Sequence, residues 1–283
     1  MKKLVTLLAI VATSAFTYAQ VTTPSASAPA GYEVKVGLTE VELEFNRPNK
    51  SDRQIFGDLV PYDKMWRTGA NKNSTIEFSD DVKIEGQTVK AGKYAIFTKP
   101  SKKSWEVYFY TETENWGLPE KWDDAKVAAK VTAKVHHLPM EVETFSISID
   151  DIKYDEAKLN FLWSNVYVEV PIHFPTDEKV MVSIKNTMNN SPKMEDYFAA
   201  ANYYYNTKKD IKQAKEWFDE GMKLSKEPKF WQLRQQSLIY AEAGDFKGAI
   251  KLAQQSLDLA KKAGNDDYAK MNQASIDSWS KKK

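Results

Sequence analysis

Residues 34–45 read Val-Lys-Val-Gly-Leu-Thr-Glu-Val-Glu-Leu-Glu-Phe, an alternation of apolar and polar side chains. In the second half of this stretch the apolar residues share one face of an extended chain and the acidic residues share the other: Val41, Leu43 and Phe45 against Glu40, Glu42 and Glu44. A period of two residues is typical of a β-strand that buries one face. Residues 34–45 therefore predict β-structure.

The same period recurs along the chain from Tyr32 to about Phe174. Further strands are predicted at 75–78, 82–84, 94–98, 105–110, 127–135, 144–149, 158–163 and 166–173. Turn-forming pairs such as Glu85-Gly86 and Lys99-Pro100 separate them. Many short strands at spacings of about 10 residues favour an antiparallel β-sandwich, with a partly open barrel as the alternative. The lack of a helical pattern between the strands argues against a parallel α/β sheet.

The period changes to that of a helix after Pro175. Helices are predicted at 177–189, 194–206, 211–225, 229–243, 246–263 and 266–279, with Thr176 as the N-cap of the first. Their short connections predict antiparallel neighbours. The predicted fold class is therefore a segregated α+β chain. It has an antiparallel β-sandwich over residues 32–174 and an all-α, tetratricopeptide-like helical-hairpin domain over residues 175–283.

The helical segment contains an internal near-repeat. Ala214 and Ala249 lie 35 residues apart, close to the 34-residue period of tetratricopeptide hairpins. Only two units are visible, whereas solenoids usually need about three, so a generic helical bundle remains the alternative. Because such hairpins bind peptides, the aromatic residues of the segment are candidates for docking a protein or peptide partner. These candidates are Tyr204, Tyr205, Trp217, Trp231 and Tyr240.

The N-terminus has the pattern of a secretory signal peptide. Lys2 and Lys3 precede an apolar run over residues 4–16, and small residues lead to a predicted cleavage after Ala19. The run is shorter than the roughly 20 residues of a membrane-spanning helix, so the competing interpretation as an anchor is disfavoured. Residues 20–31, rich in Pro, Ser and Ala, are predicted to be a flexible lead-in. We expect an exported protein without a transmembrane segment in the mature chain. The periplasm is the favoured location, with the outer membrane or the cell exterior as alternatives.

Composition excludes several classes of function. With 40 Lys and Arg against 39 Asp and Glu, the net charge of +1 gives no reason to expect a nucleic-acid partner. The absence of cysteine excludes disulfides, thiolate zinc sites and cysteine nucleophiles. The three histidines lack metal-binding spacing, and no nucleophile elbow, P-loop or dinucleotide fingerprint occurs. We therefore predict no cofactor, no metal and no catalytic residue. Acidic pairs such as Asp80-Asp81 keep a hydrolase only as the lowest alternative.

The segment from Asn46 to Asn71 is loop-like but rich in Arg, aromatic residues, Gly and Pro. Such a loop can hold an anion through an arginine while an indole ring packs on the body of the ligand. The candidate ligand-binding residues are Arg47, Arg53, Trp66, Arg67 and Asn71, together with Trp116 from a later turn-rich segment. The alternative is structural: the arginines hydrogen-bond backbone carbonyls and hold a long loop against the sandwich. Trp163 is predicted to be a core residue.

This loop and the blocks that follow it resemble a known family. The run from Pro61-Tyr62 to Trp66-Arg67-Thr68-Gly69-Ala70-Asn71, followed by Ala91-Gly92-Lys93-Tyr94 and Trp116-Gly117, is similar to an exported domain-of-unknown-function family common in Bacteroidetes. Its hallmark is a P-Y-x-x-x-W-R-T-G-A-N segment, and many members carry a helical extension. Asp63 and Lys72 depart from the family pattern, which often has Gly and Glu there. The resemblance covers residues 30–174 and implies fold and export, not an activity.

The leading functional hypothesis is an exported, non-catalytic binding or scaffold protein of the cell envelope, whose helical appendage docks a protein. The alternative is a module that binds a glycan or a small anionic ligand through the Trp66/Arg67 loop. An envelope hydrolase that uses a carboxylate pair ranks below both.

Overall fold

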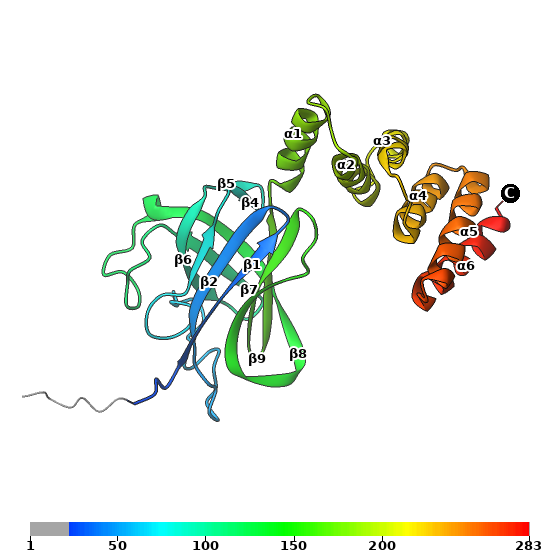
Figure 1. Ribbon diagram of the computed structural model, residues 1–283. Coiled ribbons are helices and arrows are strands. Elements are labelled where there is room, and N and C mark those ends of the chain that lie inside the picture. The colour runs from blue at the N-terminus through cyan, green and yellow to red at the C-terminus, as the bar shows by residue number, and fades with distance from the viewer. Residues whose placement is uncertain (1–22, 283) are drawn as a thin grey trace, which may run out of the picture.

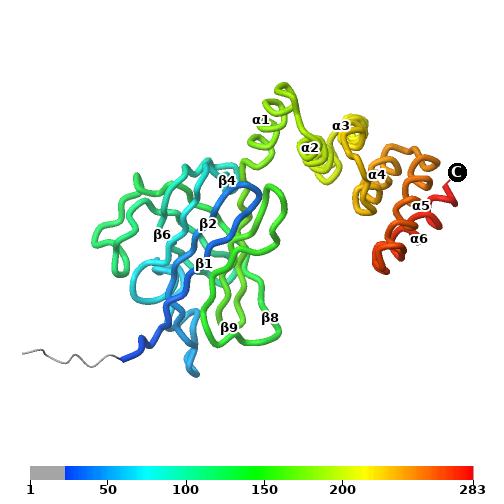
Figure 2. The backbone as a smooth tube through the Cα atoms, viewed as in Figure 1, coloured from blue at the N-terminus to red at the C-terminus, as the bar shows by residue number. Residues whose placement is uncertain are grey.

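The computed structural model describes residues 23–282 and has a β-rich part followed by an arm of helices (Figure 1). The predicted signal peptide, residues 1–19, lies outside the described residues. The predicted fold class is confirmed, because a large antiparallel sheet precedes six helices. The chain passes from the end of β9 directly into α1, as the backbone trace of Figure 2 shows.

In the described part of the chain, nine strands form one antiparallel sheet. They are β1 (Ala28–Val36), β2 (Thr39–Arg47), β3 (Thr75–Phe78), β4 (Val82–Ile84), β5 (Gln87–Val89), β6 (Gly92–Pro100), β7 (Ser104–Tyr110), β8 (Val127–Asp150) and β9 (Glu156–His173). The order across the sheet is β1-β2-β3-β6-β7-β8-β9-β4-β5. β1 starts at Ala28, so the last four residues of the predicted lead-in belong to the sheet, and β5 was not predicted.

Two pairs of predicted strands are each one long strand. Segments 127–135 and 144–149 are both part of β8, and segments 158–163 and 166–173 are both part of β9. Between the pairs His137–Val166 and Val142–Ser164 the register slips, so residues 138–141 bulge opposite Asn165. A bulge bends the strand that carries it. The bend lets one half of β8 pair with β7 while the other half turns toward β1 and β2.

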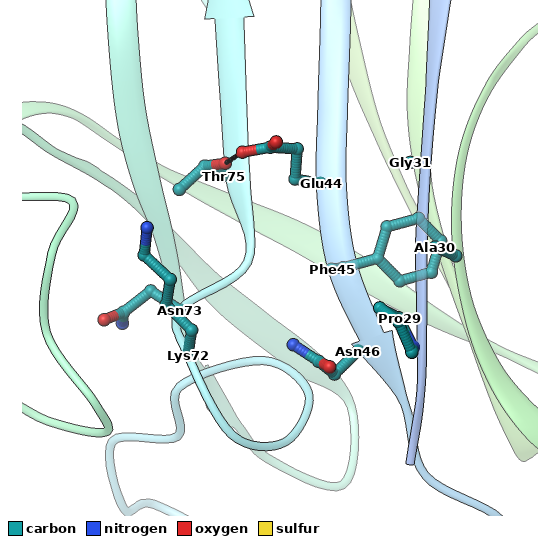
Figure 3. Close-up of a pocket in the computed structure, with 9 residues that line it drawn as sticks. All are labelled: Pro29, Ala30, Gly31, Glu44, Phe45, Asn46, Lys72, Asn73 and Thr75. Atoms are coloured by element: carbon teal, nitrogen blue, oxygen red, sulfur yellow. Dashed lines mark hydrogen bonds between the residues drawn. The ribbon is translucent and has the colours of Figure 1, made fainter. Parts of the chain in front are cut away.

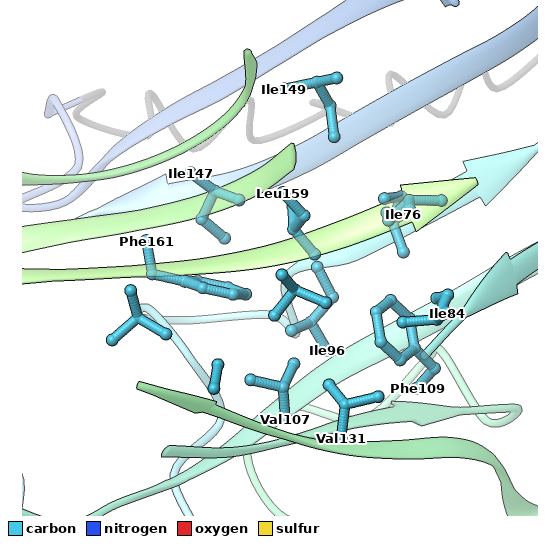
Figure 4. Close-up of a cluster of buried hydrophobic side chains, with 14 of the residues drawn as sticks. Ile76, Ile84, Ile96, Val107, Phe109, Val131, Ile147, Ile149, Leu159 and Phe161 are labelled. Atoms are coloured by element: carbon cyan, nitrogen blue, oxygen red, sulfur yellow. The ribbon is translucent and has the colours of Figure 1, made fainter. Parts of the chain in front are cut away.

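The bend folds the single sheet over one apolar core. Phe145 on the far half of β8 donates its backbone N–H to the carbonyl of Pro48, 3.0 Å away, just after β2. Ile149 donates its N–H to the phenol oxygen of half-buried Tyr32 on β1. Figure 4 shows side chains from the two layers meeting in the core: Ile147, Leu159 and Phe161 against Ile96, Val107 and Val131. The two faces of the predicted sandwich are therefore parts of one curled sheet.

The six helices are close to their predicted bounds. They are α1 (Thr176–Met188), α2 (Met194–Asn206), α3 (Ile211–Leu224), α4 (Phe230–Glu242), α5 (Phe246–Lys262) and α6 (Asp266–Ser280). α2 packs on α3, and α5 packs on both α4 and α6. Asp210 and Asp245, 35 residues apart, cap α3 and α5 with their side chains, and the equivalent Ala214 and Ala249 are fully buried between helices. The predicted near-repeat thus consists of two equivalent helical hairpins.

The prediction that Thr176 caps α1 is wrong. Pro175 occupies the cap position, no side chain caps this end, and Thr176 is the first helical residue. Its side chain is buried against the β1–β2 turn, where a Cβ on Gly37 would lie 2.0 Å from the Thr176 Oγ1. Gly37 also has φ +59°, so both the lack of space for a Cβ and the left-handed backbone conformation require glycine in this turn. Packing against the turn, and not capping, explains the threonine.

Charged side chains join the first two helices to the sheet and to each other. Asp80 accepts hydrogen bonds from Lys179 of α1 and from Thr39 of β2, each at 2.8 Å. Asp177 of α1 accepts from Tyr203 of α2 at 2.8 Å and pairs with Lys209 at 2.7 Å. These contacts hold α1 and α2 at the end of the sheet that carries the β1–β2 turn. Within residues 23–282, none of the helices is both long and apolar enough to span a bilayer.

Candidate functional site

Two of the candidate arginines hold the long loop between β2 and β3. Arg47 donates from Nε to the Phe145 carbonyl at 3.1 Å and from Nη2 to the Ser146 Oγ at 2.7 Å, which ties the end of β2 to the far half of β8. Arg53 donates from Nε to the Lys50 carbonyl at 2.9 Å and from Nη2 to the Asn49 carbonyl. These bonds satisfy backbone oxygens that the irregular loop leaves unpaired.

Trp66 belongs to an aromatic cluster at the edge of the core. Its ring stacks on Trp163 with centroids 6.0 Å apart and meets Phe145 edge-on at 5.2 Å. Trp163 is buried, as predicted, with 2% of its surface exposed. The backbone of Trp66 also pairs with Thr98 of β6. The indole is therefore committed to packing, and only part of it faces a cavity.

The loop is held in an unusual backbone conformation. In residues 23–282, ten non-glycine residues have positive φ, and five of them lie here: Ser51, Asp52, Asp63, Thr68 and Asn71. Left-handed conformations cost on the order of 1 kcal/mol each and cluster at functional sites, where the surrounding structure enforces them. Buried Thr68 is held by hydrogen bonds to Thr98 and Ser74. The loop is thus ordered at a cost in local strain.

A cavity of about 460 Å³ opens between this loop and the segment that precedes β1. Its polar lining comes from Ser27, Asn49, Ser51, Arg53 and Arg67. Its apolar lining comes from Ala26, Pro48, Leu59, Val60, Gly69, Ala70, Trp66 and Trp163. Both charged residues are arginines, and no acidic side chain from residues 23–282 lines the cavity. The volume lies in the range of small-molecule sites.

Arg67 is the arginine with the fewest internal partners of the three. Within residues 23–282, its one hydrogen bond runs from Nη1 to the Asn71 carbonyl at a long 3.4 Å. Every ion pair within 4.0 Å that joins residues of the described chain uses a lysine, so none engages Arg67. A half-buried guanidinium with most donors free suits a carboxylate or sulfate, which it can bind through two parallel hydrogen bonds.

Trp116 lies beside Arg67 but does not line the cavity. Its side chain is 75% exposed, and a Cβ on the next residue, Gly117, would lie 3.4 Å from the Arg67 Nη1. Asn73 fixes this turn by donating from Nδ2 to the Gly117 carbonyl at 3.2 Å. Asn71 points elsewhere, to the Asn46 Oδ1 at 3.4 Å.

The structure thus brings three of the six predicted residues into one cavity: Arg53, Trp66 and Arg67. Arg47, Asn71 and Trp116 lie outside its lining. Sequence reasoning missed Ser27, Asn49 and Ser51. Asn49 and Ser51 lie within the loop that was singled out, so their polarity was a usable signal. Ser27 carried no such signal, because it lies 40 positions before Arg67 in the sequence, outside the loop.

A separate cavity, of about 380 Å³, is lined by β1, β2 and the segment that leads into β3 (Figure 3). Its charged groups already have partners. Glu44 pairs with Lys93 at 2.5 Å, and this hydrogen bond holds the pKa of Glu44 below its usual range. Lys72 pairs with Glu114 at 3.1 Å. Paired charges give this cavity less binding potential than the one beside Arg67.

The helical domain uses three of its five candidate docking residues for its own packing. Tyr204 meets Trp217 edge-on at 4.8 Å within the first hairpin. Tyr240 donates to Asp219 at 2.9 Å across the contact between the two hairpins. Trp231 is 49% exposed, and Tyr205 is half-buried with Lys208 above its ring. Of the five, Trp231 has the most exposed side chain.

One helical turn beyond Trp231 lies an arginine that forms no ion pair with an acidic side chain of residues 23–282. Arg234 is half-buried on α4 and donates from Nη1 to the Ser275 Oγ of α6 at 2.8 Å. Burial lowers the pKa of its guanidinium. One helical turn separates Arg234 from Trp231, so both lie on one face of α4. Sequence reasoning missed Arg234, because only the fold shows that no carboxylate comes near it.

No group of three or more His, Asp or Glu side chains in residues 23–282 is arranged to hold a metal ion. His136 and His137 follow one another on β8 opposite Tyr167 and Val166, so they point to opposite faces of the sheet.

Comparisons with known proteins give one result. Comparisons with curated proteins and with solved structures found no significant match. Residues 27–172 match a protein family described as "Protein of unknown function (DUF2911)". The matched range agrees with the resemblance predicted over residues 30–174 and coincides with the curled sheet. The chain therefore belongs to this family of proteins of unknown function.

Proposed function

We propose that the protein is an exported, non-catalytic binding protein whose β-domain takes a small anionic ligand, a carboxylate, a sulfate or an acidic sugar, in the cavity beside Arg67. One observation carries this proposal. Arg67 faces a cavity of about 460 Å³ that holds a second arginine and no acidic side chain from the described chain, and its own guanidinium has one long internal hydrogen bond.

The chemistry of the cavity fits such a ligand. A guanidinium has five donors in a planar fork, and two of them match the two oxygens of a carboxylate. Partial burial strengthens the pairing because less water competes for the charge. Leu59, Val60 and the edge of Trp66 would contact the body of the ligand, and the exposed indole of Trp116 could cover it from the neighbouring turn.

Isothermal titration calorimetry with matched probes tests the proposal. We expect glucuronate to bind and glucose to bind far more weakly, because only glucuronate carries the carboxylate. Arg67→Gln should weaken glucuronate binding by about 10- to 100-fold, the loss expected for a hydrogen-bonded charge pair. Lys134→Gln, which removes an exposed positive charge on β8, is the matched control. The proposal is wrong if glucuronate, acetate and sulfate all fail to bind, or if both variants behave like the wild type.

Export rests on the N-terminal pattern of two lysines, an apolar run and small residues. We propose a periplasmic mature protein that begins at Gln20. Intact mass measurement of the protein from a periplasmic fraction checks this. A mass that corresponds to the uncleaved chain would contradict it.

A second candidate function is docking of an acidic peptide on the helical arm, and it is favoured by Trp231 and Arg234 on one face of α4. The half-exposed indole offers apolar area, and the guanidinium has a serine but no carboxylate as its neighbour. Aromatic residues and arginine are the residue types that dominate binding energy at protein interfaces.

Fluorescence anisotropy with peptides that end in a free carboxylate or in an amide tests this candidate. The free acids should bind more tightly, and Arg234→Gln should remove the difference between the two sets. Trp217→Phe, inside the first hairpin, is the control for changes in packing. Equal binding of acids and amides to the wild type would contradict the assignment to Arg234.

A further inference from the structure

The cavity beside Arg67, the first cavity, has a second cavity next to it. It measures about 410 Å³ and lies against the same loop, with Gln54, Tyr62, Glu141 and Asn165 in its lining. Its walls continue those of the first cavity. Trp163 of β9 lines the first cavity, and the next residues of the same strand, from Ser164 to Val166, line the second cavity.

Residues 49–53 form the ridge between the two cavities. Asn49 and Ser51 line the first cavity, whereas Lys50 and Asp52 line the second. Arg53 lines both. Its guanidinium is fixed on the ridge by the carbonyls of Asn49 and Lys50, yet its side chain is exposed. Its remaining donors are therefore available at the crossing point.

The two cavities differ in charge. The first contains two arginines and no carboxylate from the described residues. In the second, Lys50 pairs with Glu141 at 3.1 Å, and Asp52 adds a further negative charge. The positive charges of Lys50 and Arg53 balance the negative charges of Asp52 and Glu141, and His137 also lines this cavity. Unlike the first cavity, it therefore has, among the described residues, no unpaired pair of arginines to attract a second anion. The amides of Gln54 and Asn165 and the hydroxyl of Tyr62 can bond to uncharged hydroxyl groups. The pair of cavities thus suits a ligand with one anionic and one neutral polar unit.

The backbone of the loop has less to offer an extended peptide than a free strand edge would, because many of its N–H groups already have partners. Lys50 donates to the Glu143 carbonyl, Gly57 donates to the Val60 carbonyl, and Val60 donates to the Ile55 carbonyl. Peptides that bind in extended form depend on such main-chain bonds. Recognition here falls to side chains, which favours a hydroxyl-rich ring over a peptide.

We infer that the two cavities form one groove for an acidic oligosaccharide of at least two units, with the acidic sugar at Arg67, a neutral sugar beyond the ridge and Arg53 at the link between them. The inference rests on the proposed anion site and specifies its ligand. Each cavity lies in the volume range of small-ligand sites, so each can hold about one sugar ring.

The test is calorimetry on the full mature protein with three probes: glucuronate, a disaccharide of one uronic acid and one neutral hexose, and the corresponding neutral disaccharide. We expect the acidic disaccharide to bind about tenfold more tightly than glucuronate, because it adds one or two hydrogen bonds in the second cavity. Asn165→Ala and Gln54→Ala should each reduce this gain and leave glucuronate binding unchanged. Gln255→Ala, an exposed glutamine on α5, is the matched control.

The outcomes separate the two levels of the proposal. If glucuronate binds through Arg67 but the acidic disaccharide is no tighter, the extended groove is overturned and the anion site stands. The same holds if neither second-cavity variant changes the gain. Tighter binding of an Asp-Ser dipeptide than of the acidic disaccharide overturns the sugar assignment. If no acidic probe binds, the anion site itself is overturned. Circular dichroism of each variant establishes that it is folded.

Discussion

The loop between β2 and β3 and the helical arm use their side chains in opposite ways. In the loop, the backbone is irregular, and Arg47 and Arg53 donate hydrogen bonds to carbonyl oxygens that hold it in place. Arg67 has only one long hydrogen bond within the described chain and faces a cavity. In the arm, the helices satisfy their own backbones, and aromatic residues such as Tyr204 and Trp217 fill the space between them. In the regular helical arm most large side chains pack against neighbouring helices. In the strained loop the irregular backbone leaves a cavity, and arginine donors without a partner in the described chain lie at its edge.

This contrast predicts that, among the substitutions that follow, removal of the Trp66 side chain causes the largest loss in the free energy of unfolding. Trp66→Ala would remove the stack on Trp163 and the edge contact with Phe145. We expect a loss of about 3 to 4 kcal/mol in the free energy of unfolding, as for other large aromatic residues at a core. Urea unfolding followed by fluorescence measures it. Trp116→Ala, at a 75% exposed site, should stay within about 0.5 kcal/mol. Equal losses for the two variants would show that the two indoles do not differ in role.

The polar contact between the hairpins should come second. Asp219 accepts from Gln236 at 2.7 Å, from Tyr240 at 2.9 Å and from Lys215 at 3.1 Å. Asp219→Ala leaves these donors unpaired, and we expect a loss of about 2 to 3 kcal/mol in the helical arm. Hydrogen exchange should show faster exchange in α3 and α4 and unchanged protection in β6 and β7. Unchanged protection of α3 and α4 would contradict the role of Asp219 as the link between the hairpins.

A third prediction compares the stability lost on substitution of Arg47, which holds the loop, with that lost on substitution of Arg67, which faces the cavity. Arg47→Gln removes two hydrogen bonds from a charged donor and should cost about 1.5 to 2 kcal/mol of unfolding free energy. Arg67→Gln should cost less than about 0.5 kcal/mol, because its single bond is long. Both values come from denaturant unfolding without ligand. A larger loss for Arg67→Gln than for Arg47→Gln would make Arg67 the structural residue.

The smallest effect is expected at the junction of the two regions, and it should depend on pH. Hydrogen bonding from Lys179 lowers the pKa of Asp80 below its ordinary value of 3.8. A lowered folded pKa adds stability above the unfolded pKa, and this stability is lost as the pH falls through the folded pKa. Asp80→Asn should therefore cost about 1 kcal/mol or less at pH 7, because the pair is partly exposed.

The difference between Asp80→Asn and the wild type should begin to shrink as the pH falls to about 3.8, where Asp80 of the unfolded chain takes up a proton, and should disappear only below the lowered pKa of folded Asp80. Thermal melts over a pH series measure the trend. Asp81→Asn, the neighbouring carboxylate that pairs with Lys90 and not with a lysine of α1, is the control for simple loss of charge. A difference that stays constant down to pH 2 would mean that the ion pair does not stabilise the junction.

Most of the element bounds could be predicted because their signals are local. Asp210 and Asp245 cap their helices through neighbouring N–H groups, and Gly244 and Gly264 end helices with positive φ. The merging of predicted segments into β8 and β9 could not be predicted, because residues 138–141 read as a turn until their partner strand shows that they bulge. Thr176 was assigned as a cap on its residue type alone, without knowledge of the turn packed against it.

The candidate site could be predicted only as a segment. Arg47, Arg53 and Arg67 look alike in sequence, and nothing local distinguishes them. Arg47 finds its partners almost one hundred residues away on β8, and Arg67 finds no carboxylate in the described chain. Ser27 joins the site only because the segment before β1 passes the loop.

Alternation, helical period and turn chemistry were enough to determine an antiparallel sheet followed by helical hairpins, because each depends on residues a few positions apart. The tertiary structure alone decided that the Trp66 indole packs at the core, that Arg47 is structural while Arg67 faces a cavity, and that two cavities share one ridge. These properties depend on how close distant segments come, and burial and pairing have no meaning until the chain has folded.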